Sequence, residues 1–124
     1  KPYLLKTLRS TDSAVIQTTA PEANGKLAAS PHTLELIRRG MHRAVNAPGG
    51  GAKQARNSKI ELSGKTGTAE VGSRENRYKN TWFTGFGTDP KTGKTYAITV
   101  MVMHGVGGGK TAAPLASRFF EQWL

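Results

Sequence analysis

Residues 63–71, SGKTGTAEV, constrain the structure and chemistry of this chain more than any other stretch. A polar segment precedes them and two apolar segments follow, so we expect a strand. Alternate residues of a strand share a face, which predicts Lys65 and Gly67 on one face. Thr66 and Thr68 are then expected on the opposite face. An ammonium group, two hydroxyls and open backbone N–H groups together suit a carboxylate or a developing oxyanion.

The triplet Lys-Thr-Gly by itself is a weak signal, because the chain carries a second copy at residues 91–93. That copy follows Asp89-Pro90 between two strand-like segments, which predicts a hairpin turn. The longer string KTGTAE at residues 65–70 is far more specific. Its first four residues would occur in order by chance about one time in a thousand in a chain of this length. The alternative for Lys65 is a solvated lysine on an edge strand.

The chain has 124 residues, which fits one domain or a piece of one. Only 36% of the residues are hydrophobic, a low share for a self-sufficient core. The sequence begins at Lys1 without a methionine, and it contains neither a signal segment nor an apolar run of membrane-spanning length. We therefore expect a fragment without a membrane span of its own. The absence of cysteine excludes disulfides and thiolate metal sites.

The formal net charge is +10, which requires a nucleic-acid function to be considered. Most of the excess positive charge falls between residues 38 and 79, but the basic residues are dispersed. No helix-turn-helix pair, zinc-finger spacing or RNA-binding aromatic motif accompanies them. We therefore expect a solvated basic surface and no nucleic-acid partner, although attraction to an anionic polymer or membrane surface remains compatible with the charge.

The clearest helix follows Ser30, a good N-cap, and Pro31, which suits a first helical turn. It should end near Asn46, before a proline and a run of glycines. Its apolar residues recur at helical spacing and form one stripe: Leu34, Ile37, Met41, Ala44 and Val45. The polar, glycine-rich segment 47–59 has no period, and we expect a mobile loop there.

Four other segments have the β-branched and aromatic composition of strands: residues 2–8, 14–19, 81–87 and 95–103. The last two are separated by the turn 89–94, which predicts an antiparallel hairpin. Segment 95–103 is apolar on both faces, so we expect it to be central in a sheet or covered by helices. The charged segment 72–80 is expected to be a surface loop.

Residues 104–111, HGVGGGKT, are like a nucleotide-binding P-loop but have His104 where that motif needs glycine. We therefore expect a flexible glycine turn and no phosphate site. A helix should follow at residues 113–123, with an apolar face that packs on the sheet, formed by Leu115, Phe119, Phe120 and Trp123. The histidines lack a ligand spacing, so neither a metal site nor a cofactor is expected.

The order of these pieces resembles the C-terminal part of the transpeptidase domain of class B penicillin-binding proteins, especially the type associated with elongation. The matching segments are residues 1–4, 31–45, 64–70, 82–86, 100–103 and 112–115. GKTGTAE at residues 64–70 carries the family's third active-site motif. The resemblance implies an α+β fold, with an antiparallel sheet flanked by helices as in serine β-lactamases and transpeptidases. Residues 1–124 would be the C-terminal portion of a single transpeptidase domain.

In this family, acyl transfer runs through a serine. A Ser-x-x-Lys motif supplies the nucleophile, and a Ser-x-Asn motif comes second. Neither occurs in this chain; Tyr78-Lys79-Asn80 is like a variant of the second motif but follows Lys65, in the wrong order. The nucleophile is therefore expected on a missing N-terminal segment or a separate chain, and the fragment alone is expected to be inactive.

The resemblance also implies residue roles. Lys65 would help hold the second-motif serine and make the site positive. Thr66 and Thr68 would bind the carboxylate of a substrate or β-lactam, and the backbone N–H of Thr68 would be one oxyanion donor. Lys65 and Thr68 would thus be catalytic, and the substrate-binding set would be Lys65, Thr66, Gly67, Thr68, Ala69 and Glu70. Glu70 and the loop 72–80 would line the edge of the cleft.

The implied activity is that of a peptidoglycan D,D-transpeptidase, which cross-links stem peptides and is acylated by β-lactams. Implied partners are the stem peptide, β-lactam antibiotics, the N-terminal remainder of the protein and other cell-wall elongation proteins. The implied location is the periplasmic face of the bacterial inner membrane, through an anchor outside this chain. Two alternatives stay open: a serine β-lactamase or β-lactam sensor of the same fold, and a basic module that binds nucleic acid or an anionic polymer.

Overall fold

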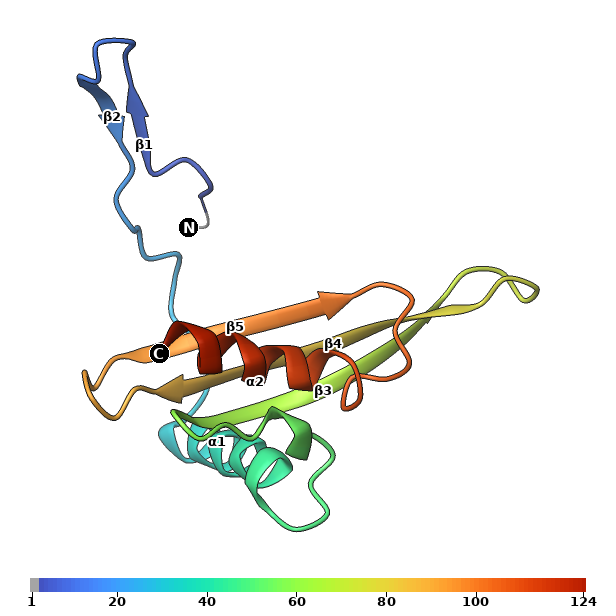
Figure 1. Ribbon diagram of the computed structural model, residues 1–124. Helices are drawn as coiled ribbons and strands as arrows, with labels where there is room; N and C mark the ends of the chain where they lie inside the picture. Colours follow the sequence, from blue (N-terminus) through green and yellow to red (C-terminus); the bar gives the residue numbers. More distant parts are fainter. Residues whose placement is uncertain (1–2) are drawn as a thin grey trace. The chain divides into compact units, whose positions relative to one another are not determined.

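A computed structural model describes residues 3–124 of the chain (Figure 1). The chain forms two compact units, Lys1–Ser30 and Pro31–Leu124. The first unit contains an antiparallel pair of short strands, β1 (Thr7–Arg9) and β2 (Val15–Thr18). Both predicted strands are confirmed in shorter form, and the expected start at Pro2 lies outside the described residues. The turn between them contains Ser13, whose backbone is in the left-handed region at φ 68°.

The second unit is an α+β fold, as predicted. Its elements in order are α1 (Pro31–Asn46), the 3-10 helix η1 (Lys53–Ala55), β3 (Glu61–Val71), β4 (Tyr78–Thr88), β5 (Thr95–Val102) and α2 (Ala112–Trp123). The strands form a three-stranded antiparallel sheet of order β3-β4-β5. In Figure 1, α2 (red) crosses one face of this sheet, and α1 (cyan) runs beside β3.

The core of this unit lies between α2, the end of α1 and one face of the sheet. Its buried residues are Val45, Ala52, Ala55, Ile60, Leu62, Phe83, Ala112, Ala113, Ala116 and Phe120. Full burial of a large apolar side chain such as Phe83 contributes on the order of 1.5–3 kcal/mol. Gly64 makes room for this ring, because a Cβ there would lie 2.3 Å from Phe83 Cζ.

The prediction of a mobile loop at residues 47–59 is wrong at its centre. Ala52 and Ala55 are buried, and η1 spans Lys53–Ala55. Arg56, directly after η1, is tied back to the end of α1, because its guanidinium donates to the oxygens of Val45 at 3.0 Å, Asn46 at 3.0 Å and Ala47 at 3.1 Å. The sequence pattern did not indicate that this segment is ordered, because the segment is held by tertiary contacts and has no hydrophobic period of its own.

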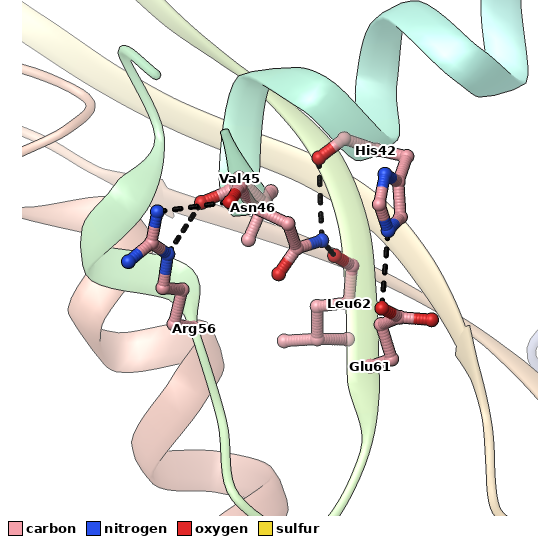
Figure 2. Close-up of polar contacts among 6 residues, drawn as sticks. All are labelled: His42, Val45, Asn46, Arg56, Glu61 and Leu62. Carbon is pink, nitrogen blue, oxygen red and sulfur yellow. Dashed lines mark hydrogen bonds and ion pairs between the residues drawn. The ribbon is translucent and has the colours of Figure 1, made fainter. Parts of the chain in front are cut away.

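Figure 2 shows how α1 is joined to the start of β3. The Asn46 side chain donates from Nδ2 to the main-chain oxygen of Leu62 at 2.9 Å and to that of His42 at 3.2 Å. One turn earlier, His42 Nε2 lies 3.1 Å from Glu61 Oε1. These contacts hold the C-terminal end of α1 against the start of β3, directly before residues 63–71.

The strand boundaries correct two predictions. The expected loop 72–80 is shorter, because β4 begins at Tyr78 and pairs with β3 as far as Val71. Segment 95–103 forms β5, which within the described residues is an edge strand of its sheet; of the two expected alternatives, a central position is wrong, and cover by a helix is found on one face only. Its residues alternate between half-buried and exposed, because α2 covers only one face.

The helix faces also differ from expectation. On α1, only Val45 of the apolar stripe is buried, and Ile37 is 52% exposed. On α2, the fully buried residues are Ala112, Ala113, Ala116 and Phe120, and Trp123 packs edge-on against Tyr96 of β5 with 4.7 Å between ring centroids. Leu115, Phe119 and Trp123 stay about half exposed in the structure. Helical spacing identifies an apolar side, but the fraction of that side that is buried depends on the partner surface.

Candidate functional site

Residues 65–68 of β3 form one wall of an open cleft of about 660 Å³. The opposite walls come from two glycine-rich segments, residues 49–54 and 106–110. Lys53, Lys65 and Lys110 all line the cleft, and no aspartate or glutamate does. The cleft is therefore electropositive and offers hydroxyl and backbone donors, which suits an anionic ligand.

The register between β3 and β4 agrees with the predicted alternation of faces. Gly67 pairs with Trp82, and a Cβ on Gly67 would lie 3.4 Å from Trp82 Cβ, so both point to the same side. Thr66 pairs with Phe83, which is buried on the side of α2. Thr68 pairs with Thr81, which is also buried there. The two cleft threonines thus point to the face that carries α2.

Lys65 is exposed, and its ammonium donates to the main-chain oxygen of Thr66 at 2.6 Å. The side chain therefore lies along β3, and Lys65 is one of the residues that line the cleft. The ion pairs recorded for residues 3–124 are His42–Glu61 and Arg77–Glu70, and neither involves Lys65. A ligand carboxylate would thus meet a cation without an acidic side-chain partner within the described part of the chain.

The hydroxyl of Thr68 has a fixed partner. Gly108 donates its backbone N–H to Thr68 Oγ1 at 3.1 Å, across a gap of forty residues in sequence. This contact brings the turn 104–111 over β3. The segment was predicted as a flexible turn, and the structure makes it a packed one, with Gly108 buried.

The remaining predicted site residues lie farther along β3. Ala69 and Glu70 are exposed and are not among the residues that line the cleft. Glu70 Oε2 lies 3.4 Å from Arg77 Nη1, and both side chains are well exposed. The structure therefore brings Lys65, Thr66, Gly67 and Thr68 together, and it places Glu70 beside the turn between β3 and β4.

Sequence reasoning missed the two glycine-rich walls of the cleft. A signal was present, since clustered glycines mark places where backbones approach closely. Gly109 illustrates this, because a Cβ there would lie 2.8 Å from the oxygen of Gly51. The glycine runs therefore let the two walls approach each other closely, which composition alone does not reveal.

The second Lys-Thr-Gly copy forms the turn between β4 and β5, as predicted. Asp89 anchors it: Thr92 Oγ1 donates to the carboxylate at 2.6 Å, and the Lys91 N–H donates at 2.8 Å. These hydrogen bonds lower the pKa of Asp89 below its usual value, and the bond from Thr92 has the largest effect. This copy is therefore structural and lies outside the cleft lining.

The described residues give no sign of a metal centre or membrane span. No group of three or more His, Asp or Glu side chains within residues 3–124 is arranged to hold a metal ion. Neither α1 nor α2 combines the length and apolar character that crossing a bilayer requires.

The sequence matches one protein-family model and is similar to curated proteins from two bacteria. Residues 1–121 match the model of the penicillin binding protein transpeptidase domain. Peptidoglycan D,D-transpeptidase MrdA of Haemophilus influenzae is 34% identical over 103 residues, which are 73% of this chain and 16% of that protein. Peptidoglycan D,D-transpeptidase PbpA of Mycolicibacterium smegmatis is 32% identical over 123 residues, covering 93% of this chain and 23% of that protein.

A solved structure has a similar fold. The D,D-transpeptidase domain of a peptidoglycan glycosyltransferase from Eggerthella lenta aligns with a TM-score of 0.66 and 23% sequence identity. The alignment covers 98% of this chain and 28% of that one. The chain thus spans less than a third of each of these relatives.

Proposed function

Because the chain belongs to the family of penicillin-binding protein transpeptidase domains, we propose that it forms the C-terminal part of a peptidoglycan D,D-transpeptidase. Residues 1–124 then lie within one transpeptidase domain, whose N-terminal part carries the Ser-x-x-Lys and Ser-x-Asn motifs. The observation that carries the proposal is the cleft at residues 65–68. It combines Lys65, two hydroxyls and strand backbone with two further lysines, Lys53 and Lys110, and no acidic residue lines it.

The residues of β3 have distinct roles in this proposal. Lys65 holds the second-motif serine and favours negative charge in the cleft. The hydroxyls of Thr66 and Thr68 donate to the carboxylate of the stem peptide or β-lactam. The backbone N–H of Thr68 is one donor to the oxyanion, and Gly67 lets the ligand approach the strand. Ala69 and Glu70 continue the ligand-binding strand beyond the cleft lining.

The reaction is a two-step acyl transfer. The serine oxygen bonds to a carbonyl carbon of the stem peptide, the peptide C–N bond breaks, and the serine proton leaves with the released amine. An amine of a second stem peptide then attacks the acyl ester. The new amide forms, and the serine oxygen regains a proton from that amine. Penicillin undergoes the first step alone, because its opened ring stays attached to the serine.

The wider setting follows from the same proposal. The protein acts on stem peptides and is inhibited by β-lactam antibiotics. It works at the periplasmic face of the bacterial inner membrane, held by an anchor outside this chain, together with other proteins of cell elongation and shape. The similarity to two peptidoglycan D,D-transpeptidases, MrdA and PbpA, supports the proposed action on stem peptides.

The test is intact-mass spectrometry of the complete protein with and without benzylpenicillin. We expect one chain to gain the mass of one penicillin and to keep it for longer than a β-lactamase would. Peptide mapping should place the adduct on a serine outside residues 1–124. A complete protein that gains no mass would contradict the proposal, and rapid loss of the adduct would favour a β-lactamase instead.

A further inference from the structure

The turn 104–111 is held at its first residue by the start of β4. His104 has a left-handed backbone, with φ 55°, and its ring stacks on Tyr78 with 4.2 Å between centroids and an interplanar angle of 18°. The next residue, Gly105, donates its N–H to the oxygen of Lys79 at 2.9 Å. A non-glycine residue in this conformation is uncommon, so the stack and the hydrogen bond stabilise a defined path of the chain.

The other end of the turn is held by the first turn of α2. Lys110 and Thr111 donate their N–H groups to the oxygen of Gly107, at 3.0 Å and 2.8 Å. Ala112 and Ala113 donate theirs to the oxygen of Gly108, at 3.1 Å and 2.9 Å. Both carbonyls are thus used within the chain segment, while the N–H of Gly108 points away from it.

That N–H reaches the cleft, where it donates to Thr68 Oγ1. The approach needs a glycine. A Cβ on Gly108 would lie 2.5 Å from the oxygen of Gly67 and 2.7 Å from that of Trp82, both main-chain atoms that cannot move aside cheaply. Gly107, its neighbour, has nothing within 4 Å of the same position. The close packing is therefore specific to Gly108.

A threonine hydroxyl has one proton to donate and two lone pairs to accept. Because Gly108 already donates to Thr68, the hydroxyl is fixed as an acceptor on that side, and its own proton must point elsewhere. Thr68 is exposed in the cleft, so the free direction is toward the ligand. We infer that Gly108 is a positioning residue, whose N–H orients the Thr68 hydroxyl to donate to the ligand carboxylate.

This inference rests on the proposed transpeptidase function. It adds that the specificity for a carboxylate depends on a turn that does not itself touch the reacting atoms. The position of the turn 104–111 depends on the Tyr78–His104 stack. Loss of the turn's position should weaken carboxylate recognition and leave the oxyanion donor of β3 in place.

The test compares acylation of the complete protein by benzylpenicillin and by its methyl ester, which lacks the carboxylate. We expect Gly108→Ala to lower the ratio of the second-order rate constant for the acid to that for the ester about tenfold. The acid should react more slowly, because a hydrogen bond to a charged group is lost. Gly40→Ala is the control and should keep the ratio, because Gly40 lies on α1 outside the cleft lining and a Cβ there would have nothing within 4 Å. If the acylation rate falls equally for benzylpenicillin and for its methyl ester, β3 itself is displaced, and the inference is overturned.

A second variant decides the matter if Gly108→Ala does not fold. His104→Ala removes the ring stack without adding an atom near Thr68, and it should lower the same ratio by about twofold or more. Thermal unfolding of each variant checks that the fold is kept. Unchanged ratios in the folded variants would overturn the inference, whereas a wild-type protein that is not acylated at all would overturn the proposed function instead.

Discussion

The Asn46 side chain donates to the main-chain oxygen of Leu62 at 2.9 Å, and so connects the last residue of α1 to the second residue of β3. The same amide donates to the oxygen of His42 at 3.2 Å. Asn46 is half-buried, so both oxygens would lose a protein partner if the amide were removed. The Asn46 side chain therefore fixes the end of α1 to the strand that carries the candidate site.

We predict that Asn46→Ala destabilises the complete protein by about 1–2 kcal/mol, because two hydrogen bonds to partly buried carbonyls are lost. Asn46→Asp should be worse at neutral pH, since it faces the same oxygens with a carboxylate that cannot donate. Urea unfolding of the two variants measures this. Stability equal to that of the wild type for both would contradict the structural role.

Lys65→Ala should slow acylation by benzylpenicillin by at least about tenfold, because a cation without an acidic partner is removed from the cleft. Lys91→Ala provides a matched control. It removes a lysine from the other Lys-Thr-Gly copy, which lies in the β4–β5 turn and outside the cleft. Stopped-flow or quench measurements of the acylation rate test the pair, and equal rates in both variants would rule out the role of Lys65.

Arg56→Lys should destabilise the protein by about 2 kcal/mol although it keeps the charge. The guanidinium of Arg56 donates to three successive main-chain oxygens, of Val45, Asn46 and Ala47. A lysine ammonium lacks this fork geometry and cannot reach all three. Denaturant midpoints of Arg56→Lys and Arg56→Ala give the measurement. A lysine variant as stable as the wild type would mean that charge near the end of α1 is sufficient.

Asp89 should contribute to stability in a pH-dependent way. Hydrogen bonds from Thr92 and from the Lys91 N–H lower the pKa of Asp89 in the folded state from its usual 3.8. A lowered carboxyl pKa stabilises the fold above the unfolded pKa, and this contribution is lost as pH falls through the folded pKa. We therefore expect wild-type stability to fall more steeply below about pH 4 than that of Asp89→Asn.

Thermal midpoints between pH 2.5 and pH 7 test the Asp89 prediction. Glu75→Gln is the control, because it removes one carboxylate from the exposed turn between β3 and β4. The control should follow the wild-type acid profile. Parallel profiles for Asp89→Asn and the wild type would contradict the linkage.

Local chemistry was sufficient to predict the elements on which the site depends. Ser30-Pro31 predicted the start of α1, and Asp89-Pro90 with its flanking strands predicted the β4–β5 hairpin. The alternation along residues 65–68 predicted the two faces of β3. Each of these features is decided by residues within a few positions of one another, through caps, turns and the two-residue period of a strand.

Other expectations failed where the answer depended on distant residues. The burial of Ala52 and Ala55 follows from packing under α2, which no local pattern indicates. The edge position of β5 depends on which strands of the sheet are present. A run apolar on both faces predicts cover on both, and α2 supplies it on only one.

The sequence by itself determined the identity of the candidate site, because Lys65, Thr66, Gly67 and Thr68 are adjacent on one strand. Only the tertiary structure decided what surrounds them: the lysines at positions 53 and 110, and the N–H of Gly108 on the Thr68 hydroxyl. The physical reason is that strand periodicity is local, whereas a cleft needs chain segments that are far apart in sequence. Their approach is set by packing, and here by glycines that leave room for it.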